Sequence, residues 1–398
     1  MEKRSQEKVL NPTVVRLGLV SLFADISSEM LYPITPIFLA TVLGASMTSI
    51  GFIEGVAEAV ASLLKTFAGS WSDRIQRRKP FVVAGYFLSA MAKPLTGVAT
   101  AWVHVLCARG LDRTGKGLRS APRDALLAEA VSPKSRGAAF GWHRAMDTIG
   151  ATIGPLLAIT YLAFYNNDLR SIYYFAVIPG VISVFFVLSI KEKKVLQANA
   201  KQNESTVFLP RAKWRDLPKD FKAYLFSWGV FSVANSSDVF LLMRAKEQGM
   251  SLNLVIFMYC FYNLTFSLMS PYFGKLSDRV PRKNILILGL FIFSLVYLGF
   301  SMATSHWHFW LLFGIYGLYM AATDGVGKAL AVDLVDSRMK ATGLGILGTV
   351  TGISTVFAST ISGGIWDQFG PSWTFIFGMA GALTAMVLLT RVQVWKKN

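Results

Sequence analysis

The sequence predicts an all-α membrane protein with twelve transmembrane helices in two pseudo-symmetric six-helix bundles. Three observations support this prediction. The chain of 398 residues is 53% hydrophobic and 16% charged, and its mean hydropathy of +0.46 lies outside the usual soluble range. Apolar stretches long enough to cross a bilayer recur along the chain. Short polar motifs of the first half also return in the second half.

Twelve stretches have the length needed to cross about 30 Å of hydrocarbon. The first six are expected at residues 14–42, 49–70, 80–99, 102–128, 137–163 and 170–190. The second six are expected at residues 221–242, 252–274, 283–303, 307–330, 340–364 and 372–392. We therefore predict an N-terminal bundle over 1–190, a polar cytoplasmic linker over 191–220 and a C-terminal bundle over 221–398.

The distribution of basic residues predicts the orientation of the chain. Lysine and arginine gather in the even-numbered connections and near both ends, whereas the odd-numbered connections contain little beyond Arg170, Arg244 and Lys246. By the positive-inside rule, both termini are expected in the cytoplasm, and the chain is expected to be a multi-pass protein of the cytoplasmic (inner) membrane. The net charge of +17 therefore reflects topology and does not indicate nucleic-acid binding.

The two halves contain related motifs at a nearly constant displacement. The segment 69–80 (GSWSDRIQRRKP) returns as 274–283 (GKLSDRVPRK), displaced by 205 residues. The segment 25–29 (DISSE) returns as 235–238 (NSSD), displaced by about 209 residues. Such repetition predicts two parallel halves, an architecture that places binding sites near the midplane of the membrane.

The segment after the second predicted span resembles the G-x-L-x-D-R-x-G-R-R signature of the major facilitator superfamily, with Gln76 at the usual glycine. The matching residues are Gly69, Asp73, Arg74, Arg77 and Arg78, and the degenerate copy contains Asp278 and Arg279. The resemblance implies a monomeric secondary transporter that works by alternating access. Because carboxylates favour helix N-termini and basic groups favour C-termini, these residues are expected to pin helix ends during gating.

Two further segments extend the resemblance. Arg109 resembles the family's helix 4 arginine, although Asp112 and Arg113 stand where glutamine and glycine are common. The run from Gly150 through Gly154 and Pro155 is similar to the G-x-x-x-G-P motif of the superfamily's proton-coupled exporters, which implies an antiporter. The alternative is that its small residues allow close helix packing and that the proline bends the helix.

The fourth predicted span is unusually polar, with seven charged side chains between residues 107 and 124. At roughly 2.5 to 3.5 kcal/mol each, charges facing lipid would cost on the order of 20 kcal/mol. They must therefore face a polar interior, where an unmatched positive field would favour an anion. Internal pairing of every charge is the alternative. Arg119 and Arg123 are expected close to the cytoplasmic surface, where membrane lipids would be their partners.

Four residues are candidates for proton coupling. Asp25 and Glu29 lie one turn apart in the first span, where two carboxylates cannot both ionise cheaply. Their protonation would release Arg109 or Arg113. His143 and Asp147, at the i, i+4 spacing, could form a proton relay. In the alternative, these groups are permanently neutralised or make only interior hydrogen bonds.

Substrate binding is predicted for polar groups in several spans. The second predicted span, 49–70, places Glu54, Glu58 and Lys65 on one stripe. A structural ion-pair role is the first expectation for this stripe, and a transport role for Glu54 or Glu58 is the alternative. The predicted substrate-binding residues are Tyr32, Glu58, Arg109, Asp112, Arg113, Lys116, Asn235, Asp238, Tyr316 and Asp324.

Several functional classes lack their motifs in this sequence. No G-x-S-x-G, H-E-x-x-H, P-loop or C-x-x-C appears, so neither an enzyme nor an ATP-driven pump is predicted. No cofactor or metal is expected, and the proton gradient is the expected energy source. The sequence thus predicts proton-coupled export of a small organic solute. One alternative is transport of an organic anion such as a carboxylate metabolite or siderophore. Another is a membrane sensor or lipid-handling protein without solute flux.

Overall fold

The computed structural model describes residues 11–75, 77–132, 135–190, 192, 217–336 and 339–392. Within these ranges the regular structure is helical and no strand occurs, which confirms the all-α prediction. Most of the predicted linker, 191–220, lies outside the described residues.

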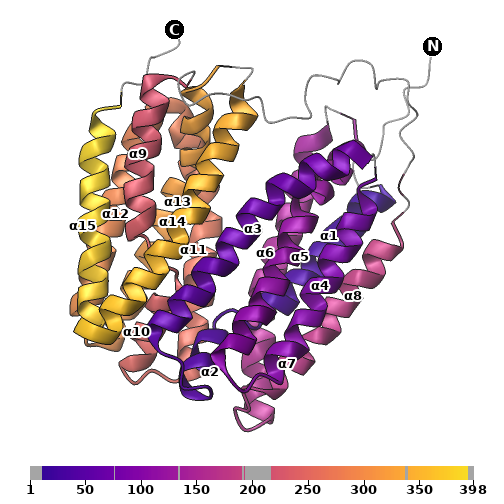
Figure 1. Cartoon of the computed structure of the whole chain (residues 1–398), viewed down its shortest axis with the longest axis horizontal. Helices are drawn as coiled ribbons and strands as arrows, with labels where there is room; N and C mark the ends of the chain where they lie inside the picture. The colour runs from indigo at the N-terminus through magenta and orange to yellow at the C-terminus, as the bar shows by residue number, and fades with distance from the viewer. Residues whose placement is uncertain are drawn as a thin grey trace. The chain divides into compact units, whose positions relative to one another are not determined.

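Each of the twelve predicted stretches is helical, but three of them are interrupted, so the described residues form fifteen helices (Figure 1). The helices from the first half are α1 (Pro12–Glu29), α2 (Thr35–Thr41), α3 (Met47–Ile75), α4 (Lys79–Gly97), α5 (Trp102–Glu129), α6 (Arg136–Phe164), α7 (Ser171–Phe175) and α8 (Val177–Leu188). Those from the second half are α9 (Lys219–Ala234), α10 (Val239–Glu247), α11 (Leu252–Arg279), α12 (Arg282–Met302), α13 (His306–Asp333), α14 (Lys340–Phe369) and α15 (Pro371–Thr390).

Two of the interruptions fall at the repeated polar motifs. The segment 25–29 ends α1, and α2 begins only at Thr35 with Pro36 as its second residue, where the missing N–H costs little. The segment 235–238 separates α9 from α10 in the same way. Hydroxyl and carboxylate side chains compete for backbone hydrogen bonds, and proline lacks a donor, so both sequences favour a helix end.

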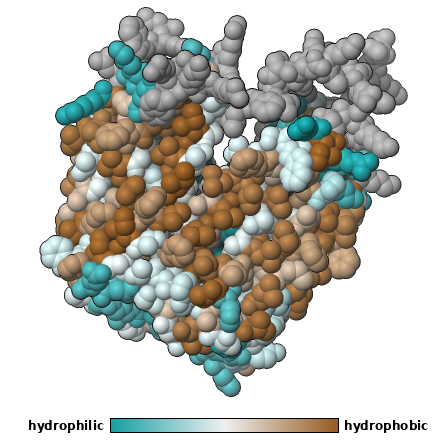
Figure 2. All heavy atoms as spheres, viewed as in Figure 1, coloured by the Kyte–Doolittle hydropathy of each residue, from teal (hydrophilic) through white to brown (hydrophobic). Residues whose placement is uncertain are grey.

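Nine helices of the described chain are long and apolar enough to cross a membrane, with α7–α8 and α9–α10 each counted as one. The remaining three predicted spans are the interrupted α1–α2, the helix α4 and the charged helix α5. Large hydrophobic side chains such as Phe67 and Phe185 are about two-thirds exposed, as expected for side chains that face lipid. In Figure 2, hydrophobic residues cover the sides of the helices and hydrophilic residues gather at their ends.

The chain forms two compact units, one from Met1–Ile34 with Val60–Phe208 and the other from Thr35–Ala59 with Leu209–Asn398. The helix α3 therefore contributes its first half to the second unit and its second half to the first. The domain boundaries expected from the sequence stay a prediction.

Helices pair in the same way within each unit. In the first unit α1 packs against α6 and α8, and α4 packs against α5 and α8. In the second unit the equivalent pairs are α9 with α14 and α15, and α12 with α13 and α15 (Figure 1). This repetition agrees with the predicted duplication.

Two close helix crossings in the first unit position its polar residues. At the α4–α5 crossing, a Cβ on Gly115 would lie 2.4 Å from the Gly85 carbonyl oxygen. At the α1–α6 crossing, a Cβ on Gly154 would lie 2.7 Å from the Ile26 carbonyl oxygen. These glycines let the backbones approach, so the close packing considered for the G-x-x-x-G-P motif is present, and its partner is α1.

In the second unit, the start of α3 packs closely against α14. A Cβ on Gly51 would lie 2.0 Å from the Ser359 carbonyl oxygen. The carboxylate of Asp367 on α14 accepts hydrogen bonds from the backbone N–H groups of Met47 and Thr48, at 3.0 and 2.8 Å. An aspartate at this position satisfies N–H groups that a helix start leaves without partners.

Candidate functional site

The charged helix α5 turns several of its side chains into the first unit. Arg119 is only 7% exposed, and Asp112 and Arg123 are half-buried, whereas Lys116 is exposed. The expectation that Arg119 reaches lipid headgroups is therefore wrong, and for the half-buried Arg123 it stays a prediction. Both guanidinium groups make hydrogen bonds to side chains of neighbouring helices, which offset the cost of burying their charge.

The Arg119 side chain of α5 packs against α4. Its Nη1 donates to the Ser89 hydroxyl at 2.6 Å, and its guanidinium lies over the Tyr86 ring, 4.3 Å from the centroid. The Ser89 hydroxyl in turn donates to the Asp112 carbonyl oxygen at 3.1 Å. A cation against an aromatic face gains electrostatic stabilisation that strengthens when water is excluded.

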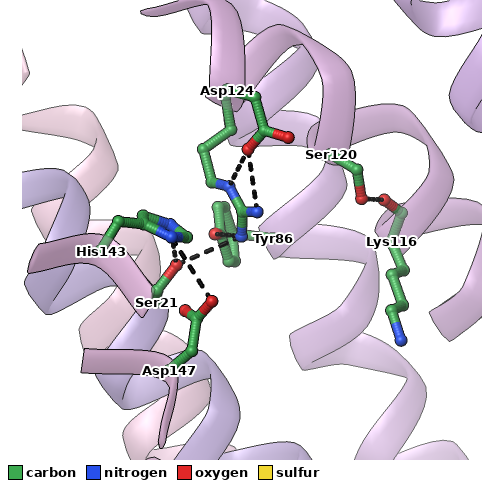
Figure 3. A network of polar contacts seen from close by, with 8 residues as sticks. Ser21, Tyr86, Lys116, Ser120, Asp124, His143 and Asp147 are labelled. Atoms are coloured by element: carbon green, nitrogen blue, oxygen red, sulfur yellow. Dashed lines mark hydrogen bonds and ion pairs between the residues drawn. The ribbon is translucent and has the colours of Figure 1, made fainter. Parts of the chain in front are cut away.

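Arg123 joins three helices through its partners Asp124, Ser21 and Tyr86, which are labelled in Figure 3. Its guanidinium pairs with the Asp124 carboxylate at 3.0 Å and donates to the Ser21 hydroxyl of α1 at 3.2 Å. A longer contact of 3.5 Å reaches the Tyr86 hydroxyl of α4. Lys116 lies apart from this group in the same view.

The predicted relay residues His143 and Asp147 lie in contact on α6. His143 Nδ1 is 3.4 Å from Asp147 Oδ2, and its Nε2 is 2.6 Å from the Ser21 hydroxyl (Figure 3). The order Ser–His–Asp also occurs in hydrolases, but Ser21 is 1% exposed and accepts a hydrogen bond from Arg123. Its oxygen is thus closed to a substrate, whereas the chain of heteroatoms is suited to passing a proton.

Asp25 lies where charges of both signs meet. The groups that act on it most strongly are the carboxylates of Asp147 and Glu29 and the guanidinium groups of Arg119 and Arg123. The two arginines differ from Arg109 and Arg113, which the sequence suggested as partners. Glu29 is the last residue of α1, and Tyr32 follows in the turn before α2.

In the second unit, Asp238 is the centre of a group of tyrosines. Its carboxylate accepts hydrogen bonds from the Tyr316 hydroxyl at 2.6 Å and the Tyr262 hydroxyl at 2.9 Å. Glu58 and Glu54 also act on it electrostatically. Of the predicted substrate-binding residues, Asp238 and Tyr316 are thus in contact, and Glu58 acts on this pair only through its charge.

Two other predicted substrate-binding residues have different surroundings. The Asn235 amide donates to the Tyr319 hydroxyl at 3.2 Å. Asp324 is half exposed and forms an ion pair with Lys328 at 2.6 Å.

The residues predicted for gating form the same pattern in both units. Arg78 pairs with Asp73 at 3.0 Å and with Glu129 at 2.6 Å. Arg282 pairs with Asp278 at 3.3 Å and with Asp333 at 2.7 Å. Arg74 and Arg77 are exposed at the end of α3, and Arg279 is exposed at the end of α11. A Cβ on Gly69 would lie near Ala121 of α5. Pro155 lies inside α6.

Several polar residues of these networks are absent from the sequence prediction. Lys93 is 6% exposed, and as an isolated charge in the apolar stretch 80–99 it had a recognisable signal. Ser21, Ser89, Tyr86 and Tyr262 had none, because single hydroxyl groups are common in transmembrane helices. Arg282 was recognisable only by alignment of the two repeats. Among the described residues, no group of three histidine, cysteine, aspartate or glutamate side chains is suited to a metal.

Comparison with known proteins gives the family. The model of the Major Facilitator Superfamily matches residues 17–261 and 223–396. An uncharacterized MFS-type transporter of Methanocaldococcus jannaschii is 34% identical over 98% of this chain and 96% of its own. Multidrug resistance protein 2 of Bacillus subtilis is 23% identical over 97% and 96%.

Solved structures share the fold. The nucleoside transporter NupG superposes with a TM-score of 0.79 over 96% of this chain and 100% of its own, at 14% identity. The family model covers nearly the whole chain, and the fold agrees with it. The chain therefore belongs to the major facilitator superfamily, and it is a multi-pass membrane transporter, not an enzyme.

Proposed function

We propose that this transporter is proton-coupled and exports a small organic solute across the cytoplasmic membrane by alternating access. The observation that carries this proposal is the position of Asp25 among Asp147, Glu29 and two arginines inside the first unit. A carboxylate placed between like and opposite charges changes its interactions strongly when it binds a proton. Such a change is what a coupling step requires.

In this mechanism, Asp25 or Glu29 binds a proton from one side of the membrane. The loss of negative charge weakens the attraction to Arg119 and Arg123 and permits the change of access. His143, Asp147 and Ser21 form the route by which the proton reaches or leaves Asp25. The motif at Gly154 and Pro155, and the relative named as a multidrug resistance protein, support export of an organic solute.

The remaining expectations complete the proposal. Tyr32, Asn235, Asp238, Tyr316 and Glu58 are proposed to contact the solute. The chain works as a monomer with both termini in the cytoplasm, and the proton gradient is its energy source.

A second candidate is transport of an organic anion. Arg109, Asp112, Arg113 and Lys116 place three positive charges and one negative charge within two turns of α5. Guanidinium groups suit carboxylates, so this surplus favours an anionic solute such as a carboxylate.

The test uses purified protein in vesicles that enclose a pH-sensitive dye. Ethidium, uridine, D-xylose, benzoate and succinate are added one at a time with and without a pH gradient. We expect at least one solute to cause a proton flux, which Asp25→Asn and Glu29→Gln abolish. Full gradient-driven flux in both variants would remove the mechanism. A response to benzoate or succinate but not to ethidium would favour the anion candidate.

A control variant shows whether the loss is specific. Asp168→Asn changes an exposed carboxylate of the same unit, outside the networks described above. Its flux should equal that of the unchanged protein. Equal losses in Asp168→Asn and Asp25→Asn would indicate that any removed carboxylate lowers flux, and would contradict a special role for Asp25.

A further inference from the structure

Lys93 is a buried cation to which the mechanism above gives no role. It lies on α4 and is 6% exposed. Its ammonium carries three N–H donors, and among the described residues its one hydrogen bond goes to the Ser89 carbonyl oxygen, at 3.3 Å. That distance is at the long end of the usual range. A charged group buried with two unused donors is costly to keep charged.

The charges around Lys93 come from two neighbouring helices. Asp112, Arg119 and Arg113 act on it from α5, and Asp25 acts on it from α1. The other helices packed against α4 are α7 and α8, and neither contains a charged side chain. Two carboxylates thus stabilise the ammonium and two guanidinium groups oppose it.

The three cations of this group differ in their ability to lose a proton. Arginine stays charged under all ordinary conditions, whereas a buried lysine readily becomes neutral. Lys93 is therefore the residue whose loss of a proton reduces the repulsion among Lys93, Arg113 and Arg119. Loss of this proton depends on the nearby carboxylates, because each ionised carboxylate stabilises the charged form of Lys93.

We propose that Lys93 is a proton-exchanging residue of the transport cycle, charged while Asp25 is ionised and neutral while Asp25 holds a proton. The inference rests on the proposed function, because it takes Asp25 as the proton-binding group. Protonation of Asp25 removes one of the two negative charges near Lys93, and both arginines remain. One proton enters at Asp25 and one leaves from the Lys93 ammonium to water, so the net charge of the unit is conserved.

The test observes the lysine side chain directly and needs no known solute. The full chain is labelled with ¹⁵N at its lysine side chains, reconstituted in phosphatidylcholine vesicles and studied by solid-state NMR between pH 5 and 10. The ¹⁵Nζ resonance distinguishes an ammonium from an amine, and its loss in Lys93→Met assigns it. We expect the Lys93 resonance to change from the ammonium to the amine position within this range.

Removal of the neighbouring charges should move this transition in a defined direction. In Asp25→Asn the pH midpoint for Lys93 should fall by about one unit, a tenfold weaker hold on the proton, because a stabilising negative charge is gone. Asp112→Asn should lower it further, since Asp112 is the strongest of the charges acting on Lys93. The matched control Asp168→Asn should leave it unchanged. If Lys93→Met does not fold, the resonance that Asp112→Asn moves gives the assignment.

Two results would overturn the inference: an ammonium at Lys93 over the whole pH range, or an unchanged midpoint in Asp25→Asn. A flux measurement with the responding solute adds a second criterion. Lys93→Arg keeps the charge and Lys93→Met removes it, and both should lose at least tenfold in proton flux, because neither can exchange a proton. Retained flux in Lys93→Arg would indicate simple charge balance instead.

These readouts separate the inference from the proposed function. Unchanged flux in Asp25→Asn would defeat the coupling role of Asp25 whatever the NMR result. A midpoint of Lys93 that does not respond to Asp25→Asn would defeat only the exchange between the two residues.

Discussion

At the scale of single residues, the buried polar groups of this protein obtain their partners from hydroxyl groups on other helices. The Ser89 hydroxyl accepts a hydrogen bond from Arg119, and the Ser21 hydroxyl is hydrogen-bonded to Arg123 and His143. Tyrosine hydroxyls donate to the Asp238 carboxylate. Hydroxyl groups are suited to this role because each can donate one hydrogen bond and accept others. Charged side chains in the membrane can thus be satisfied without a partner of opposite charge for each one.

The tyrosine bonds of Asp238 give a prediction at this scale. Tyr316→Phe removes the donor that lies 2.6 Å from the half-buried carboxylate of Asp238. The Asp238 oxygen then loses its hydrogen bond, which should lower the free energy of unfolding by about 1 to 3 kcal/mol. The loss is measured as a lower thermal melting temperature of the purified chain.

The control for this variant is Tyr272→Phe. Tyr272 is 60% exposed, so loss of its hydroxyl should leave the melting temperature unchanged. Equal melting temperatures for Tyr316→Phe and the unchanged protein would show that the carboxylate does not depend on this bond.

At the scale of helices, close crossings decide which side chains meet. Arg119 reaches Ser89 and Tyr86 because α4 and α5 cross at Gly85 and Gly115, where no Cβ keeps the backbones apart. The same crossing brings Asp112 and Lys93 into one group. Glycine in a helix lowers its intrinsic stability, but here it permits the contacts that hold the charged network.

The crossing gives a prediction for one added methyl group. In Gly115→Ala, the new Cβ would lie 2.4 Å from the Gly85 carbonyl oxygen and 2.8 Å from the Ser89 hydroxyl. Because backbone must move to accommodate it, we expect a loss of about 1 to 3 kcal/mol, measured as a lower melting temperature in detergent.

Gly110→Ala on the same helix is the matched control. No heavy atom lies within 4 Å of a Cβ at this position, so alanine should preserve or raise stability through its better helix propensity. If Gly115→Ala melted at the same temperature as Gly110→Ala, the proposed tight crossing would be refuted.

At the scale of the whole molecule, the duplication is visible in the ion pairs as well as in the helix order. Arg78 and Arg282 each pair with an aspartate near the end of the preceding helix, α3 or α11. Each also pairs with a carboxylate at the last residue of a later helix, Glu129 of α5 or Asp333 of α13. Lys79 and Lys283, the next residues, each donate to backbone carbonyls near the end of the last helix of their unit. The two halves thus share an arrangement that the residue identities alone only partly preserve.

The orientation of the chain can be tested at this scale. A green fluorescent protein fused after Asn398 should fluoresce in bacterial cells, and alkaline phosphatase fused at the same position should be inactive, because basic residues keep this end in the cytoplasm. Fusions after Asp168, in a predicted outer connection, should give the opposite result. Active phosphatase at the C-terminus would contradict the proposed topology.

The sequence by itself determined the helical class, the positions of the spans and the duplication. These are local properties, since the length of an apolar stretch and the cost of a charge in hydrocarbon depend on neighbouring residues in the chain. Comparison of the halves also indicated that residues 25–29 and 235–238 are special, and both segments mark helix interruptions. The contact between His143 and Asp147 followed from helical spacing alone.

Only the tertiary structure decided which polar groups meet across helices. The sequence placed Arg119 near lipid and paired Asp25 with other arginines, because a helical wheel does not reveal how a helix is rotated against its neighbours. That rotation is set by the glycine crossings, and it buries Arg119 against Tyr86 and places Lys93 near Asp112 and Asp25. Burial of a charge depends on contacts between residues far apart in the chain, so it becomes definite only when the helices pack.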